Sequence, residues 1–588
     1  MRIFTALQHL YLRKPVSSIT LICVISVLPW IAMGDFSTKG EPREAAVAVS
    51  ILENGNWILP TVYANEFAYK PPMMHWLIAA FSLPEGMVSE FTSRLPSAMA
   101  LVLMSVFVWM LFGRKTRFQE AFIAILLLLT CVEIHRAGMT ARVDMLLTFF
   151  IVTGLIRLFS WEDESELKGF PVIIPLILSG AMLTKGPVGV ILPLFVFGVY
   201  LLMLRKYGLL KIIKSMVYMG VASCLIPLLW YVEAWRQGGN DFLNVVLAEN
   251  FGRFFHLGDG NIPYDLGHEN GAWYNLMTLA AGFIPWTLLL FFSLFGLKIR
   301  KPDTPCKQWL KKSWNALLSM DKIKLFSLVA STGIVFFYSI PSSKRSVYLM
   351  PAYPFIALFI AQYLIYLTEY RTRLFRVFAS LLLTIVSVVI LVVFVHVTGI
   401  IDLNRLIAGY ITHRSTLETF EAITQSLSPG ITQVIIYLLL LAAAGILFCQ
   451  LRKKINSKIL YASILLVFFV NLFIDGVIMR EIRNTTSARP FAKEIRKDYP
   501  LDQTNLYVMN DLRNYANLYG MNFYMGNCFR NFEVEQPQSG YFLSTEKDYP
   551  VIQQHFKGKY TFETLRTSPK IIGDVRSKVV LSRFFIVE

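Results

Sequence analysis

Charged residues are scarce in this chain. They make up 16% of its 588 residues, whereas 55% are hydrophobic, and a soluble protein of this length carries nearer a quarter charged residues. Apolar runs close to the roughly 20 residues that cross a bilayer recur along most of the length. The composition excludes an ordinary soluble protein and predicts a polytopic α-helical membrane protein.

Negatively charged residues are scarcer than positively charged ones. The chain has 39 Asp and Glu against 56 Lys and Arg, which gives a net charge of +17. This excess does not gather into one patch of the kind that binds nucleic acid. Basic clusters fall instead between alternate apolar runs, beginning at Arg114, Arg205, Lys298, Arg371 and Arg452. Because basic loops stay on the cytoplasmic side, these loops are expected inside, and no nucleic-acid partner is expected.

Several sequence motifs are also missing. The six cysteines show no C-x-x-C or Cys/His spacing, which argues against a disulfide framework or a zinc site. The chain has no H-E-x-x-H, and T-K-G-P-V-G around Lys185 lacks the spacing of an ATP-binding loop. An activated donor in the membrane therefore fits this chain better than a soluble nucleotide.

The apolar runs and basic loops together predict about thirteen membrane spans. They lie near residues 16–33, 93–112, 118–134, 142–160, 171–184, 187–204, 215–235, 272–297, 324–341, 347–368, 376–397, 431–450 and 459–478. The first run follows Arg13 and Lys14 as a signal peptide would, but no small-x-small cleavage site precedes Asp35, which favours an uncleaved helix. With a cytoplasmic N-terminus, an odd number of spans places the C-terminal segment outside.

Two parts of the chain are expected. Residues 1–479 form a transmembrane domain whose long exterior loops, 34–92 and 236–271, carry helices that lie in the membrane interface. Residues 480–588 are more polar and alternate strand-like with helix-like pieces. They predict a small α/β domain of ordinary size on the periplasmic side.

The first exterior loop opens with G-E-P-R-E, which reads as the start of a short helix. Pro42 suits the first helical position, and it would hold Glu41 extended at or just outside the N-cap. Asn54 and Gly55 form a stop signal. The sequence thus predicts acidic and basic side chains on a short helix beside the membrane.

Charged and histidine side chains gather at the ends of spans on the predicted outer face. The group consists of Glu41, Arg43, Lys70, His75, Arg94, His135, Arg136, Arg142, Asp144, Lys185, Arg253, His256, His268, Lys344 and Arg345. Any single Arg or Lys is equally well explained as an anchor for lipid phosphates, but a group drawn from five or six loops indicates a site. Such cations would hold a lipid phosphate as charge grows on it, while a carboxylate takes the proton of an incoming hydroxyl.

The stretch GEPREAAVAVSILENGNWILPTVYANEFAYKPPMMHWLIA, from Gly40, resembles the first exterior loop of the polyprenyl-phosphate-dependent C-type (GT-C) glycosyltransferases. This family includes the protein O-mannosyltransferases and the bacterial lipid A aminoarabinose transferase. Its pattern is an acidic pair, an Arg one residue on, a helix ending in G-x-W-x-x-P, and a later K-P. The segments ARVDMLLT, ENFGRFF with WYNLMTLAAGFIPW, and SSKRSVYLMPAYP resemble the same family in the same order.

The resemblance implies roles for seven residues. Glu41 and Asp144 are the catalytic candidates, Glu41 as the base or acceptor-orienting group and Asp144 in support of the acceptor side. The donor phosphate would be held by Arg43, Lys70, Arg253, Lys344 and Tyr348. Gly40 departs from the pattern, since it stands where relatives have the first carboxylate of the acidic pair. If that residue is the base elsewhere, Glu41 acts from a shifted position, or Asp35 or Asp144 substitutes.

Two further departures from the family pattern concern metal binding. Tyr69 and Asn250 stand where the aminoarabinose transferase has a glutamate and a histidine that bind a metal ion. No metal or cofactor is therefore expected, and the alternative is a divalent cation held by Glu41 and Asp144. Tyr348 is equally well explained as an interfacial aromatic anchor.

The resemblance implies a membrane enzyme that moves a single sugar from a polyprenyl (undecaprenyl-type) phosphate to an extracytoplasmic acceptor, with inversion of the anomeric centre. Lipid A, a surface glycan and a protein hydroxyl stay open as acceptors, and the retained Glu41 favours a hydroxyl, which needs a base more than a phosphate does. The chain is expected in the inner (plasma) membrane, with its site and C-terminus outside. The alternative is a lipid-linked sugar transporter or flippase without transferase activity, which would carry charges at mid-membrane depth on several helices.

Overall fold

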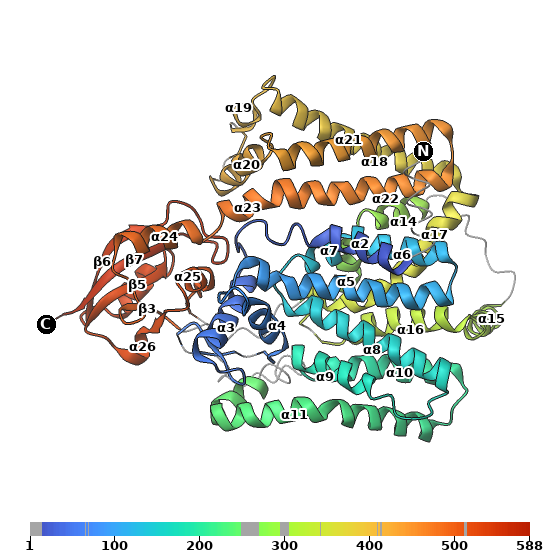
Figure 1. Cartoon of the computed structure of the whole chain (residues 1–588), viewed down its shortest axis with the longest axis horizontal. Coiled ribbons are helices and arrows are strands. Elements are labelled where there is room, and N and C mark those ends of the chain that lie inside the picture. Colours follow the sequence, from blue (N-terminus) through green and yellow to red (C-terminus); the bar gives the residue numbers. More distant parts are fainter. Residues whose placement is uncertain are drawn as a thin grey trace.

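The computed structural model is a bundle of apolar helices with a smaller domain, built around a β-sheet, at one end of it (Figure 1). It describes residues 15–587 apart from 65, 69, 248–269, 295–304, 342, 409, 412–413 and 511–513. The expected class, a polytopic helical membrane protein with a small C-terminal sheet domain, is confirmed.

Apolar runs form the helices of the bundle. They are α2 (Pro15–Val27), α5 (Glu90–Lys115), α6 (Phe118–Thr130), α7 (Val132–Gly138), α8 (Val143–Ser165), α9 (Ile173–Lys185), α10 (Val188–Leu204), α11 (Leu209–Leu247), α13 (Tyr274–Gly282), α14 (Trp286–Leu294), α16 (Lys322–Phe337), η2 (Ser346–Ala352), α17 (Tyr353–Tyr370), α18 (Thr372–Val397), α21 (Ile431–Lys453), α22 (Asn456–Phe473) and η3 (Ile474–Ile478). Shorter helices connect them: α3 (Gly40–Asn54), α4 (Met73–Ser82), α15 (Cys306–Leu318), α19 (Leu403–Ala408), α20 (Arg414–Ser426) and α23 (Met479–Thr485).

The expected thirteen membrane spans can be compared with the length and composition of the described helices. Each predicted run overlaps helix, but in the described part of the chain seven helices are long and apolar enough to cross a membrane, or up to nine if two bent pairs each count once. The bends are 67° between α6 and α7 and 113° between α13 and α14. The predicted runs 118–134 and 272–297 are therefore not straight spans, and thirteen crossings are not confirmed.

The helix α3 starts earlier than the sequence predicts. Its first residue is Gly40, and Glu41 lies in the first helical turn. The expectation that Pro42 holds Glu41 extended is wrong, because Glu41 is fixed within the helix by an ion pair with Arg94 and by a hydrogen bond from the backbone of Ala141. The predicted stop is confirmed, since Gly55 ends the helix with φ 67°.

The two predicted exterior loops differ in structure. Residues 34–92 contain α3, α4 and a two-stranded hairpin of β1 (Thr61–Val62) and β2 (Glu66–Phe67). Residues 236–271 begin inside α11, which continues to Leu247 and breaks at Gly239. The remainder of that loop up to residue 269 lies outside the described residues.

The C-terminal domain follows α23 and contains a mixed sheet. In the described part its strands are β3 (Leu506–Val508), β4 (Arg530–Asn531), β5 (Ser539–Thr545), β6 (Tyr560–Thr567) and β7 (Val579–Ile586), in the order β4-β3-β5-β7-β6. The strand β3 is parallel to β4 and β5, and β7 is antiparallel to β5 and β6. Helices α24 (Arg489–Asp498), α25 (Tyr519–Tyr524), α26 (Phe532–Glu535) and α27 (Tyr549–His555) accompany the sheet. The domain boundary predicted at residue 480 stays a prediction.

The bundle has two chemically different ends. At the end opposite the C-terminal domain, the Glu162 carboxylate accepts hydrogen bonds from Tyr207 at 3.0 Å and Lys322 at 3.3 Å. The neighbouring Asp163 accepts from Lys115 at 2.5 Å and from Lys322 at 3.0 Å. We call this the basic end, because predicted cytoplasmic clusters meet there. The other end carries α3, α4 and the C-terminal domain (Figure 1) and is called the site end.

Candidate active site

Three carboxylates at the site end are buried and paired with basic side chains. Glu41 and Glu44 lie three residues apart on α3 and are each 1% exposed, and Asp144, in the first turn of α8, is 6% exposed. A buried charge is stable only when it is paired and hydrogen-bonded. The partners of each carboxylate therefore define what it can do.

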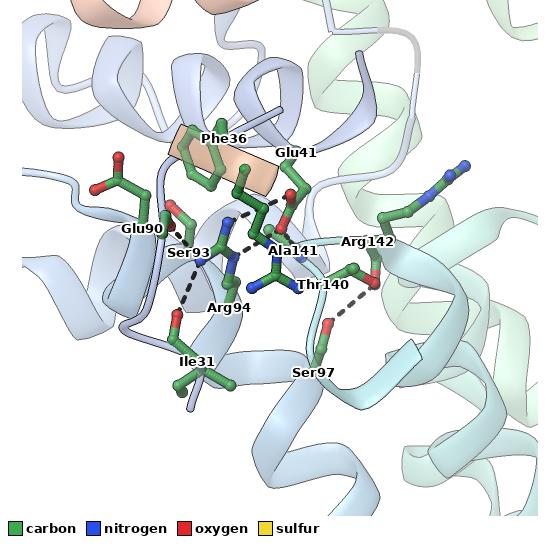
Figure 2. Close-up of polar contacts among 12 residues, drawn as sticks. Ile31, Phe36, Glu41, Glu90, Ser93, Arg94, Ser97, Thr140, Ala141 and Arg142 are labelled. Carbon is green, nitrogen blue, oxygen red and sulfur yellow. Dashed lines mark hydrogen bonds and ion pairs between the residues drawn. The ribbon is translucent and has the colours of Figure 1, made fainter. Parts of the chain in front are cut away.

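Glu41 is bonded to Arg94 of α5. The Nε of Arg94 donates to Oε1 at 2.8 Å, and the backbone N–H of Ala141 donates to the same oxygen at 3.1 Å (Figure 2). The remaining guanidinium N–H groups donate to Glu41 Oε2 and to backbone carbonyls of residues 31–35. Burial opposes ionisation of Glu41, but Arg94 keeps its pKa below the ordinary value. The pair joins α3, α5 and the segment after α2, and it leaves Glu41 facing protein.

Glu44 is the centre of a cluster made by α3, α4 and the segment between β2 and α4. Its Oε1 accepts hydrogen bonds from Lys70 and, at 3.0 Å, from Nη2 of Arg43. Its Oε2 lies 2.8 Å from Nε2 of His75 in the first turn of α4. Burial alone would raise the pKa of Glu44, but Lys70, His75 and Arg43 hold it well below its usual range. One carboxylate thus orders two of the cations that the sequence assigns to the donor phosphate.

Asp144 is the centre of the second cluster. Lys185, the last residue of α9, donates to Oδ1 at 2.5 Å, and Nε of Arg142 lies 3.5 Å from Oδ2. The Lys185 ammonium also lies 4.3 Å from the ring centroid of Tyr348 in η2, within cation–π range. Lys185 therefore connects two residues, Asp144 and Tyr348, that the sequence placed in the site separately.

The two clusters are neighbours. Lys70 interacts electrostatically with both Asp144 and Arg142. A Cβ built on Gly40 would lie 3.5 Å from Cζ of Arg142. A carboxylate at this position, which the resemblance implies for the family, would thus lie near Arg142, whose guanidinium here contacts Asp144. Figure 2 shows the Arg142 side chain pointing away from the Glu41–Arg94 pair.

The predicted site residues fall into three groups. The clusters around Glu44 and Asp144 contain Arg43, Lys70, Asp144 and Tyr348. Glu41 stands apart with Arg94, and Lys344 donates from Nζ to the carbonyl oxygen of Asn270 at 3.2 Å. His135 and Arg136 of the outer-face group pair elsewhere, with Asp475 at 2.5 Å and with Glu133 at 2.9 Å. Five further residues lie outside the described part of the chain: Arg253, His256, His268, Tyr69 and Asn250.

Three residues with clear structural partners had received no individual role from the sequence. They are Glu44, Arg94 and Lys185. Glu44 had a detectable signal, because it lies three residues after Glu41 on the predicted helix, and residues three apart on a helix lie close together. The choice of Arg94 and Lys185 among many outer-face cations had no comparable signal, since their partners are far away in the sequence.

The C-terminal domain packs against α3. The ring of Tyr519 in α25 lies 6.0 Å from the charged groups of both Lys39 and Arg43. Arg489 of α24 pairs with Asp35 at 2.8 Å and with Glu90 at the start of α5. This domain therefore borders the Glu44 cluster and is tied to the same segments that frame it.

Comparison with known proteins identifies similar sequences. Residues 69–231 match the family model described as dolichyl-phosphate-mannose-protein mannosyltransferase. A protein of Aquifex aeolicus (strain VF5) is 30% identical over 322 residues, which are 54% of this chain and 57% of that protein. The undecaprenyl phosphate-alpha-4-amino-4-deoxy-L-arabinose arabinosyl transferase of Shewanella sediminis (strain HAW-EB3) is 23% identical over 63% of this chain and 64% of its own length. The match thus spans less than two thirds of each of these relatives.

A solved structure shares the fold. ArnT from Cupriavidus metallidurans, bound to undecaprenyl phosphate, superimposes with a TM-score of 0.67 over 96% of this chain and 97% of its own, at 16% sequence identity. The fold is therefore that of this GT-C protein along nearly the whole chain. The resemblance to polyprenyl-phosphate-dependent glycosyltransferases that the sequence predicts is confirmed.

Proposed function

We propose that this chain is a membrane glycosyltransferase that moves a single sugar from a polyprenyl-phosphate donor to an extracytoplasmic acceptor. The observation that carries the proposal is the pair of neighbouring clusters at the site end, where Lys70 and Arg43 stand beside Lys185 and Arg142. A membrane-embedded donor brings its phosphate to the end of the bundle, where these cations lie. Relatives named for undecaprenyl phosphate support a donor of the undecaprenyl type.

The reaction proposed is a direct displacement. The acceptor oxygen forms a bond to the anomeric carbon as the bond from that carbon to the phosphate oxygen breaks, and the electron pair stays on the phosphate. Lys70 and Arg43 oppose the charge that grows there, with Arg253 and Lys344 as further candidates. Attack from the face opposite the leaving phosphate inverts the anomeric centre.

The pairing of the carboxylates bears on the acceptor. Glu41 holds α3 to α5 in this proposal, rather than removing a proton, because its oxygens are taken up by Arg94 and Ala141. Glu44 and Asp144 are also ion-paired, and a carboxylate stabilised in its charged form is a weak base. An acceptor oxygen that arrives ionised needs no base. The geometry therefore favours an acceptor with a phosphate, of which lipid A is one example, over a hydroxyl of a glycan or protein.

We propose that the reaction proceeds without a metal ion or other cofactor. Among the residues that the structure describes, no group of three or more His, Cys, Asp and Glu side chains could hold a metal ion. The carboxylate oxygens of Glu44 and Asp144 already accept hydrogen bonds from cations. Those cations supply the positive charge that a metal would bring to a phosphate.

We propose that the site end faces the periplasmic side of the inner membrane. The basic end gathers Lys115, Lys206 and Lys322, and basic loops remain in the cytoplasm. The ion-paired clusters lie at the two ends of the bundle rather than at mid-depth, which favours a transferase over the alternative of a lipid-linked sugar transporter or flippase.

Transfer of label from purified polyprenyl-phosphate sugars to extracted lipids and proteins tests the proposal. Label is expected in a lipid fraction, and removal of acceptor phosphates before the assay is expected to abolish transfer. Label on protein would point to a hydroxyl acceptor. Movement of intact donor across a vesicle membrane, with no transfer to any extract, would replace the proposal with the transporter.

A further inference from the structure

Glu44 is the carboxylate that two of the proposed donor-phosphate cations contact in this structure. Its Oε1 accepts hydrogen bonds from both Lys70 and Arg43. The Glu44 side chain is 2% exposed, while those of Lys70 and Arg43 are 17% and 19% exposed. A single anionic oxygen thus lies behind two partly exposed cations, on their protein side.

The arrangement of Lys70 and Arg43 around Glu44 Oε1 resembles the arrangement of such donors around a phosphate oxygen. Two charge-assisted donors converge on one anionic oxygen, which is how Lys and Arg hold phosphate. A phosphate bound in front of Lys70 and Arg43 competes with Glu44 for the same N–H groups. Glu44 is therefore placed to weaken the hold of these cations on any phosphate.

His75 fixes the direction in which Glu44 points. Its Nε2 lies 2.8 Å from Oε2, so the other oxygen faces Lys70 and Arg43. His75 is 2% exposed, and its Nδ1 has no hydrogen-bond partner among the described residues. The polar contact of the imidazole is with Glu44, and it keeps that carboxylate oriented toward Lys70 and Arg43.

Charge on the phosphate changes during the reaction. The donor is a phosphodiester with one negative charge, whereas the spent carrier is a monoester with about −1.5 to −2 at neutral pH. Two cations bind the spent carrier more tightly than the donor, which slows turnover once chemistry is complete. A competing anion of fixed position reduces this difference.

We infer that Glu44 is a positioning residue that competes with the phosphate for Lys70 and Arg43 and so promotes release of the spent polyprenyl phosphate. The inference rests on the proposed function. Glu44 acts through the two cations and touches neither the sugar nor the acceptor. The substitution Glu44→Gln keeps the size of the side chain and removes its charge.

The test measures binding of undecaprenyl phosphate to the purified protein in detergent, together with steady-state turnover. Because Glu44 raises the pKa of Lys70, binding is measured at a pH low enough to keep Lys70 protonated in the variant. There E44Q is expected to bind this lipid about 10- to 100-fold more tightly, since a hydrogen bond to a charged group contributes on the order of 1.5–3 kcal/mol. Its kcat is expected to fall and product inhibition to increase, while the donor KM does not rise. A structural role alone would lower kcat without tightening the binding of the product.

Glu162→Gln is the matched control. Glu162 is 0% exposed and accepts hydrogen bonds from Lys206, Lys322 and Tyr207, so it too is a buried carboxylate among basic groups. It lies about 27 Å from Asp144 along α8, at the basic end. E162Q is expected to lower thermal stability and leave the affinity for undecaprenyl phosphate unchanged.

Two further variants keep the outcomes distinct. Glu44→Asp moves the carboxylate away from the cations by one methylene, and it is expected to tighten binding of undecaprenyl phosphate several-fold. It replaces E44Q in the test if E44Q does not fold. Lys70→Ala is expected to weaken binding of the lipid. If E44Q, or E44D in its place, binds equally or more weakly while K70A still weakens binding, the role of Glu44 is refuted and the proposed site stands. If neither K70A nor the Glu44 variant alters binding, the phosphate lies elsewhere, and both the role of Glu44 and the proposed phosphate site are refuted.

Discussion

Arg94 and Glu41 form a buried ion pair across α5 and α3, with Nε and Oε1 2.8 Å apart and the two side chains 0% and 2% exposed. The Arg94 guanidinium also donates to backbone carbonyls of residues 31, 34 and 35. One side chain therefore holds three segments of the site end together. The pair stabilises the frame in which the neighbouring Glu44 and Asp144 clusters are built.

The substitution Glu41→Gln is expected to act mainly on stability. It leaves the Arg94 charge buried without its counter-ion, which typically destabilises by about 3–5 kcal/mol. Thermal unfolding in detergent should show a clear fall in Tm, while turnover per folded molecule stays within about tenfold of the parent. Loss of a catalytic base would instead lower turnover about 10²- to 10⁴-fold.

The double substitution Glu41→Leu with Arg94→Met provides the control for this prediction. Replacing both members of a buried ion pair with apolar residues is often neutral or stabilising, so part of the lost stability should return. Recovery is not complete, because the carbonyls of residues 31, 34 and 35 lose the Arg94 donors. If E41Q unfolds at the temperature of the parent but has lost its turnover, Glu41 is the base after all.

Parts of this arrangement could be predicted from the sequence. The end of α3 at Gly55, the C-terminal sheet domain and the gathering of charges at one end follow from local patterns of turn residues, alternation and hydropathy. The start of α3 could not be predicted, because the preference of a pre-proline residue for extended backbone is outweighed by long-range contacts of Glu41. The partner of each carboxylate could not be predicted either. Glu41 and Arg94 are 53 residues apart, and nothing in the sequence favours Arg94 over the other basic residues of the outer face.

Donor binding is expected to weaken as pH rises through about 7. Burial, and the nearby charges of Arg43 and Arg142, lower the pKa of Lys70 to about 7, although Glu44 opposes the shift. Lys70 is charged below that pH and loses its proton above it, so the cluster loses one positive charge facing the phosphate. Binding of the donor, measured from pH 6 to 9, should fall by up to about tenfold per unit above pH 7.

Lys70→Arg tests the source of this pH dependence. Arginine stays protonated throughout the range, so the variant should bind the donor with a flatter pH profile, whatever its absolute affinity. An unchanged profile in K70R would assign the titration to the phosphate or to another group.

Tyr348 is expected to act through its ring. The Lys185 ammonium lies 4.3 Å from the ring centroid, and such a contact contributes about 0.5–2 kcal/mol. Tyr348→Phe should therefore retain most activity, while Tyr348→Leu should raise KM or lower kcat by about 2- to 30-fold. Equal activities of the Phe and Leu variants would favour the interfacial-anchor explanation instead.

Attachment of the C-terminal domain is expected to be stronger in mild acid. Burial raises the pKa of Glu66, in the hairpin, to about 7 and that of Asp574, in the C-terminal domain, to about 6. Both groups interact electrostatically with Lys39. Between about pH 4 and 7 the folded protein binds more protons than the unfolded chain, so stability falls as pH rises.

Limited proteolysis and thermal unfolding at pH 5.5 and 8 test this prediction. The difference is expected to be about 2 kcal/mol in favour of the lower pH. Glu66→Gln, which stays neutral at both values, should reduce the difference while leaving the fold intact. A protein that is more stable at pH 8 would show that other groups dominate the interface.

Transfer is expected to survive exhaustive chelation. In the proposed site, positive charge at the phosphate comes from Lys70 and Arg43, and the neighbouring carboxylates of Glu44 and Asp144 are already paired with cations. A divalent ion would have to displace Lys185 or Lys70 to gain hard oxygen ligands. Activity is measured after dialysis against EDTA and again after addition of Mg²⁺, Mn²⁺ or Zn²⁺. Loss of transfer on chelation, restored by one of these ions, would mean that the carboxylates exchange their lysine partners for a metal when the donor binds. Asp144→Asn separates the two arrangements, because a metal-dependent enzyme would then need a higher ion concentration, while a metal-free one would show no ion dependence at all.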